Sequence, residues 1–94
     1  MAFVDLLPDE TGALDQDAGV EELGGVADVD GRVFELSGGT AILTVRHGLD
    51  RLPTAAIPIY ITDGFSDLRV VSASDETIQL ERSNTSATVR VLVY

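Results

Sequence analysis

His47 is the residue best suited to acid–base chemistry, because it is the only histidine in the chain and imidazole changes its charge near neutral pH. A general base also needs a nucleophile and an orienting group within bonding reach, and the sequence places neither beside it. His47 continues the alternation of Ala41, Leu43 and Val45, so its ring is expected on the apolar side at the end of a strand. We therefore predict a structural histidine that bonds the loop following it, and no catalytic residue.

Closely spaced aspartates suggest a second chemistry, the binding of calcium. An EF-hand loop supplies six to eight oxygens at fixed spacing and ends on a glutamate, whereas Asp28-Val29-Asp30-Gly31 has only the opening of such a pattern. Asp-Gly is also the commonest hairpin turn, so turns, with no metal and no cofactor, are the prediction. A calcium- or carbohydrate-binding β-module stays open as an alternative, and it would use Asp28, Asp30, Asp63 and Asp67.

Composition argues against several other classes of function. The chain has no lysine for a phosphate-binding loop and no cysteine for thiol chemistry or a disulfide framework. Its sixteen acidic residues could form carboxylate pairs for glycoside hydrolysis, but five aromatic residues give little platform for a sugar. The prediction is a protein that is not an enzyme.

The net charge of −10 is concentrated in the first third of the chain. Residues 1–30 hold nine acidic residues and no arginine, whereas residues 31–94 hold seven acidic residues and all six arginines. Surfaces for nucleic acids or anionic membranes need clustered cations, so neither partner is expected. Nor is there an apolar run long enough to span a bilayer, and Met1–Asp5 lacks the cationic start of a secretion signal.

Hydrophobic residues alternate with polar ones from residue 40 onward, which is the period of a β-strand. Expected strands are Thr40–Arg46, a run with Ile57, Ile59 and Ile61 on one face, Leu68–Ser72, Thr77–Arg82 and Ala87–Tyr94. Val26–Val29 and Arg32–Leu36 could add a hairpin around Asp30-Gly31. The fold class is therefore all-β, a small antiparallel sandwich or barrel-like meander. Pro58 cannot donate to a ladder, so its strand is expected at an edge or bulged.

Two parts are expected: an extended acidic arm over residues 1–24 and a β-sandwich body over residues 25–94. Asp17–Leu23 could form one helical turn, which Gly19 and Gly24 weaken. Apolar residues among the acids indicate that the arm docks on a partner. The arm residues expected at that contact are Phe3, Val4, Asp5, Leu6, Leu7, Asp9 and Glu10.

So small a body without disulfides is marginal in stability, and oligomerisation is the remaining common remedy. A homo-oligomer is therefore expected, with a trimer favoured. Leu92 and Tyr94 lie on the second face of the last strand and are the candidates for its interface.

The segment Thr44-Val45-Arg46-His47-Gly48-Leu49-Asp50-Arg51-Leu52-Pro53-Thr54 precedes the apolar stretch Ala55–Ile61. It resembles a pattern in small virion proteins of tailed viruses, in which a strand runs into His-Gly-Leu-Gly-Arg-x-Pro-Thr/Ser and then an apolar strand. Val89–Tyr94 is similar to their Val-x-Val-Leu-Val closing strand, and Thr77–Leu80 fits the strand before it. The likeness covers about residues 40–94, and Asp50 stands where the family usually has its second glycine.

This motif is expected to be a structural corner made by His47, Gly48, Leu49, Arg51 and Pro53. His47 ends the strand, Gly48 allows a sharp reversal, Leu49 fills the core and Pro53 fixes the start of the next strand.

The resemblance implies a virion structural protein, and we favour a capsid decoration (cement) protein located in the virion. Its partner would be the major capsid protein or another virion protein. A tail or fibre-adaptor subunit is the close alternative.

Overall fold

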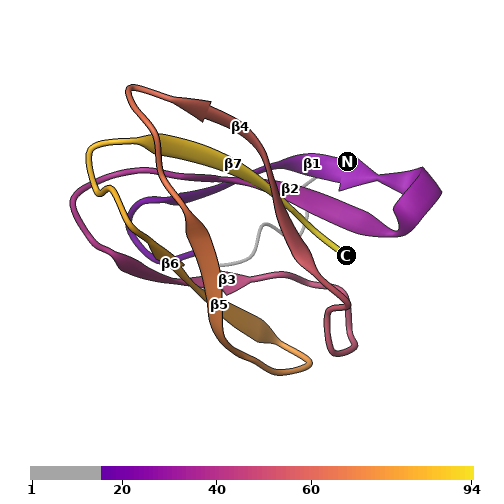
Figure 1. Ribbon diagram of the computed structural model, residues 1–94. Helices are drawn as coiled ribbons and strands as arrows, with labels where there is room; N and C mark the ends of the chain where they lie inside the picture. The colour runs from indigo at the N-terminus through magenta and orange to yellow at the C-terminus, as the bar shows by residue number, and fades with distance from the viewer. Residues whose placement is uncertain (1–15) are drawn as a thin grey trace, which may run out of the picture.

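The computed structural model describes residues 16–94, which form two antiparallel β-sheets packed face to face (Figure 1). The expected docking residues, from Phe3 to Glu10, lie outside the described residues. The first sheet has the strand order β1-β2-β7-β4 and the second has the order β3-β6-β5. The strands are β1 (Val20–Val26), β2 (Gly31–Leu36), β3 (Ile42–Arg46), β4 (Ala56–Thr62), β5 (Leu68–Ala73), β6 (Thr77–Arg82) and β7 (Thr88–Val93).

The core lies between the two sheets and follows the alternation of the sequence. One face of each central strand is fully buried, because successive side chains of a strand point to opposite sides of its sheet. The buried apolar side chains are Phe34, Leu36, Leu43, Val45, Ile78, Leu80, Ala87, Val89, Val91 and Val93. The prediction of an all-β sandwich is confirmed.

The connections between strands are not those of a meander. Only β1 with β2 and β5 with β6 are hydrogen-bonded neighbours that also follow each other in the chain. The connections β2–β3, β3–β4, β4–β5 and β6–β7 instead cross between the sheets. As a result β7 lies between β2 and β4 and pairs with both.

Strand β1 begins at Val20, inside the range expected to be the arm. Residues 20–24 therefore belong to the sheet, and the segment from 17 to 23 does not form the helical turn considered above. The hairpin is present, but its turn is longer than Asp30-Gly31 alone. Ala27–Val29 forms a 3₁₀ turn and Asp30 follows in the left-handed region with φ of 50°, so of the predicted Val26–Val29 strand only Val26 is extended in β1.

Strand β4 is an edge strand with a bulge, as Pro58 predicts. Pairing with β7 shifts between Pro58 and Tyr60, which leaves Ile59 as the extra residue. This bulge overturns the expected apolar face. Ile61 packs against the core, whereas Ile57 and Ile59 are 42% and 51% exposed.

Candidate functional site

The predicted corner forms the connection from β3 to β4, and His47 begins it. The His47 ring is completely buried. Its Nδ1 accepts a hydrogen bond from the backbone N–H of Leu49 at 3.1 Å, so Nε2 carries the proton and donates to the carbonyl oxygen of Ser74 at 2.9 Å. Both ring nitrogens are thus used by backbone groups, one in the loop that follows and one in the turn between β5 and β6.

The rest of the corner turns sharply at two left-handed positions. Gly48 has φ of 68° and Asp50 has φ of 57°. Between them Leu49 packs against the core. Arg51 reaches the tip of the β1–β2 hairpin, where its guanidinium donates to the carbonyl oxygen of Asp30 at 3.3 Å and lies 3.7 Å from the carboxylate of Asp30. The corner therefore connects β3 of the second sheet to two parts of the first sheet, the strand β4 and the tip of the β1–β2 hairpin.

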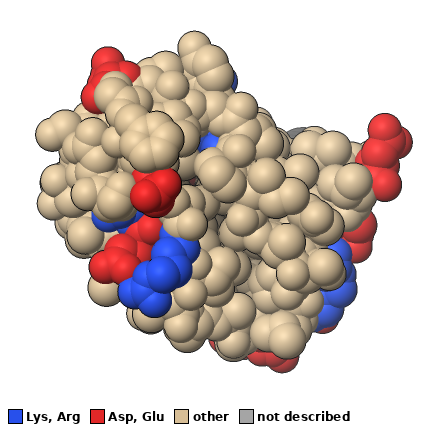
Figure 2. All heavy atoms as spheres, viewed as in Figure 1, with Lys and Arg blue, Asp and Glu red and all other residues tan. Residues whose placement is uncertain are grey.

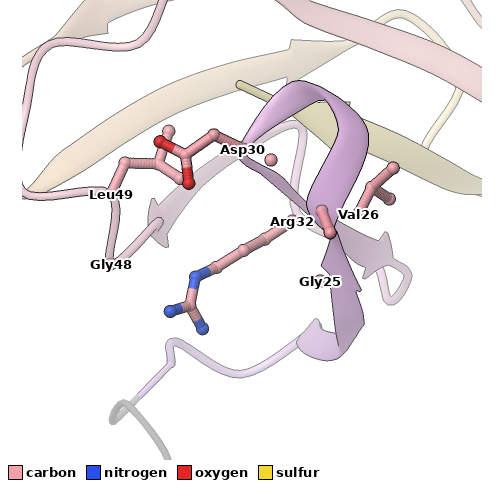
Figure 3. A pocket seen from close by; sticks show the side chains of 8 residues that line it. Gly25, Val26, Asp30, Arg32, Gly48 and Leu49 are labelled. Carbon is pink, nitrogen blue, oxygen red and sulfur yellow. The ribbon is translucent and has the colours of Figure 1, made fainter.

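A cavity of about 430 Å³ lies between this hairpin tip and the corner. Figure 3 shows the Arg32 side chain extending into the space between the hairpin and the Gly48–Leu49 loop. The guanidinium of Arg32 pairs with the carboxylate of Glu22 at 2.8 Å, so its charge is already balanced. His47 is not among the residues that line this cavity, so the histidine and Arg32 do not face the same space.

The aspartates of the calcium alternative occupy turns. Asp30 and Asp63 adopt positive φ, as Asp does before Gly in tight turns. The backbone N–H of Asp67 donates to the hydroxyl of Ser83 at 2.8 Å. Within residues 16–94, no three His, Cys, Asp or Glu side chains come together in a group that could hold a metal ion.

The expected interface residues lie at the end of β7, but they do not form one exposed patch. Leu92 is half-buried between Val33 of β2 and Ile57 of β4, which are its register partners. Tyr94 is also half-buried, and its backbone N–H donates to the carbonyl oxygen of Ala55 at 3.1 Å.

Arg82 makes contacts that its neighbours in the sequence do not predict. Its side chain is 1% exposed, and it donates to the carbonyl oxygens of Ala87 at 2.7 Å, Gly38 at 2.8 Å and Thr40 at 2.6 Å. Burial lowers the pKa of the guanidinium by desolvation. Arg82 thereby fixes the loop after β2 to the loop after β6. The sequence does indicate that Arg82 is buried, because it lies two residues beyond Leu80 on the same face of β6.

The described region gives no membrane-spanning helix, since none of its helical segments is long and apolar enough to cross a bilayer. Comparison of the chain with family models, curated proteins and solved structures gives no match.

Proposed function

We propose that this chain is a non-enzymatic structural protein of a tailed-virus particle, and specifically a decoration protein that docks on the capsid shell. The observation that carries the proposal is the state of His47. The most reactive side chain of the corner is buried and bonded at both nitrogens to backbone groups. That supports a corner used for architecture, which is the role the resemblance implies.

Docking on the shell is assigned to the first residues of the chain. Phe3, Val4, Leu6 and Leu7 would supply apolar contacts, and Asp5, Asp9 and Glu10 would meet a basic patch on the major capsid protein. Gln16, the first described residue, is held against the last residue of β3. Its side-chain amide accepts from the backbone N–H of Arg46 at 2.9 Å and donates to the carbonyl oxygen of Arg46 at 2.7 Å.

The test uses particles of the virus that carries the gene, assembled after deletion of that gene. The full chain is added back and bound protein is measured by co-sedimentation. The double variant Phe3→Asp, Leu6→Asp should lose binding. The control is Leu52→Asp, which adds one carboxylate where the double variant adds two, at a side chain already 61% exposed, and it should bind as the unchanged protein does.

Three outcomes would contradict the proposal. Equal binding by the double variant and the control would remove the docking role of residues 3–10. Saturation at a few copies at one vertex, or gene-deleted particles without tails, would favour the tail or fibre-adaptor alternative. Binding that occurs only with added calcium would favour the cation-binding β-module.

A further inference from the structure

The chain contains two Asp-Gly sequences, Asp30-Gly31 and Asp63-Gly64. In such a pair the backbone nitrogen of the glycine can attack the side-chain carboxyl of the aspartate, because glycine has no side chain to hinder the approach. Both aspartates have a left-handed backbone, with φ of 50° at Asp30 and 63° at Asp63. The two pairs therefore share their sequence and the region of φ, and they differ in what surrounds them.

The pair Asp63-Gly64 lies in the connection from β4 to β5 and is open to solvent. Both residues are exposed, and within residues 16–94 neither the Asp63 carboxylate nor the Gly64 N–H has a hydrogen-bond or ion-pair partner. In Figure 2 red atoms project at the upper left, where Figure 1 places this connection, and the atoms around them are tan. No contact among the described residues therefore keeps the carboxyl and the glycine nitrogen apart.

The pair Asp30-Gly31 is held in place by its surroundings. The backbone N–H of Asp30 donates to the carbonyl oxygen of Ala27 at 3.3 Å, and Arg51 donates to the carbonyl oxygen of Asp30 and lies 3.7 Å from its carboxylate. Gly31 is the buried first residue of β2, and a Cβ there would lie 2.9 Å from the carbonyl oxygen of Val93. Movement of the Gly31 nitrogen toward the carboxyl therefore requires the hairpin to open first.

We propose that Asp63-Gly64 is a modification site, at which water alone converts Asp63 to isoaspartate through a succinimide ring. The Gly64 nitrogen forms a bond to Cγ of Asp63, and one carboxyl oxygen leaves as water with the carboxyl proton and the N–H proton. Water then adds to the backbone carbonyl carbon of Asp63, and the bond from that carbon to the Gly64 nitrogen breaks. The backbone afterwards runs through Cβ and Cγ, a free α-carboxylate remains, and nothing is oxidised or reduced.

The product lengthens the main chain by one carbon atom, and the connection has room for it between two fixed points. Before Asp63, Thr62 is paired with Thr88 of β7. After Gly64, the carbonyl oxygen of Phe65 accepts a hydrogen bond from the Asn84 side chain at 3.0 Å. Exposed loop residues tolerate such an insertion, so the conversion changes the course of the connection and leaves both sheets paired. The inference concerns the purified chain alone and does not depend on the capsid shell as a partner.

The experiment incubates the full-length chain at neutral pH in water enriched in oxygen-18 and analyses the peptide around each Asp-Gly pair by mass spectrometry. Each passage through the succinimide places one solvent oxygen in the peptide, and electron-transfer fragmentation distinguishes isoaspartate from aspartate. In the folded chain, label and isoaspartate should accumulate at Asp63 and stay at background at Asp30. In urea the two positions should react at similar rates, because the hairpin no longer holds Asp30.

Asp63→Glu is the matched variant, since it keeps the carboxylate but would have to close a six-membered ring, which forms much more slowly. It should lose both the label and the modified residue at position 63. The proposal is overturned if position 63 of the folded chain gains neither label nor isoaspartate while the chain in urea gains both. It is also overturned if Asp63→Glu still reacts, or if Asp30 reacts as fast as Asp63 in the folded chain.

Discussion

At position 50 the backbone adopts a conformation that costs most residues energy. Asp50 has φ of 57°, where an L-residue with a Cβ pays about 1–2 kcal/mol and glycine pays little. Aspartate is here held in a conformation that glycine adopts readily. Asp tolerates this region better than most residues because its short side chain can bond locally.

We expect Asp50→Gly to be more stable than Asp50→Ala by about 1 kcal/mol. Alanine has a Cβ, which is costly in the left-handed conformation, and it lacks the polar group that offsets this cost in aspartate. Glycine has no Cβ and avoids the cost. Urea unfolding of the two variants measures the difference. The matched pair is Asp75→Gly and Asp75→Ala in the turn before β6. Asp75 has no positive φ, so there glycine should be the less stable of the two variants.

For Arg82 the sequence predicts burial of the side chain but not its hydrogen-bond partners. The alternation through Ile78 and Leu80 places Arg82 on the buried face, so its burial could be predicted. Its hydrogen-bond partners could not be predicted, because the carbonyl oxygens of Gly38 and Thr40 belong to a loop more than 40 positions earlier in the chain. His47 differs, since one of its two partners, Leu49, is only two residues away.

At the scale of the strands, β2 and β7 approach closely where β2 begins. A Cβ added at Gly31 would lie 2.9 Å from the carbonyl oxygen of Val93 and 2.9 Å from the Cβ of Tyr94. Since one of these atoms is backbone, the strands themselves would have to move. The pairing of β2 with β7 therefore depends on the absence of a side chain at this residue.

Gly31→Ala should lower the free energy of unfolding by about 1–3 kcal/mol, the usual cost of overpacking. Gly39→Ala is the control, because a Cβ there would meet nothing within 4 Å and its φ is not positive. It should be neutral or slightly stabilising. Thermal and urea unfolding measure both variants, and an equal loss at the two positions would show that the close approach is not the cause.

The sequence predicts β3, β6 and β7 nearly to their ends because their alternation is regular, and it also places β5 although that strand contains a bulge. It fails for β1 and for the face of β4, and both strands contain a bulge. A bulge inserts one residue and reverses the side to which later residues point, so a strict period of two assigns Ile57 and Ile59 to the wrong side. Pro58 signalled that a bulge was possible, but the sequence did not show at which residue it would occur.

At the scale of the whole molecule, the boundary of the body lies before β1 and not at residue 24. Val20 packs against the core and β1 covers the edge of β2 along its length. A chain shortened to the expected boundary would lose most of this strand, whereas a chain shortened to residue 16 would keep it.

Deletion of residues 1–15 should leave the melting temperature nearly unchanged, and deletion of residues 1–24 should lower it. The second deletion removes Val20, which is partly buried against the core, and it exposes the edge of β2. Differential scanning calorimetry of the two proteins makes the comparison. Unfolding of the shorter deletion would mean that residues 1–15 are part of the core, and equal stability of both would mean that β1 is dispensable.

The central place of β7 also has a consequence for the newly made chain. β2 and β4 are both complete before β7 is synthesised. Leu36 of β2 pairs with Val89 of β7, which is about 50 residues later in the chain. Synthesis of that many residues takes several seconds at typical rates of translation. During that interval β4 has no partner in its sheet and β2 is paired on one side only, by β1, so both strands have an open edge that is available to other chains. The sheet that β7 completes thus forms late, by contacts between distant residues, which is the slowest kind of folding for a small domain. How long the nascent chain must be kept from aggregating is set by when β7 is synthesised.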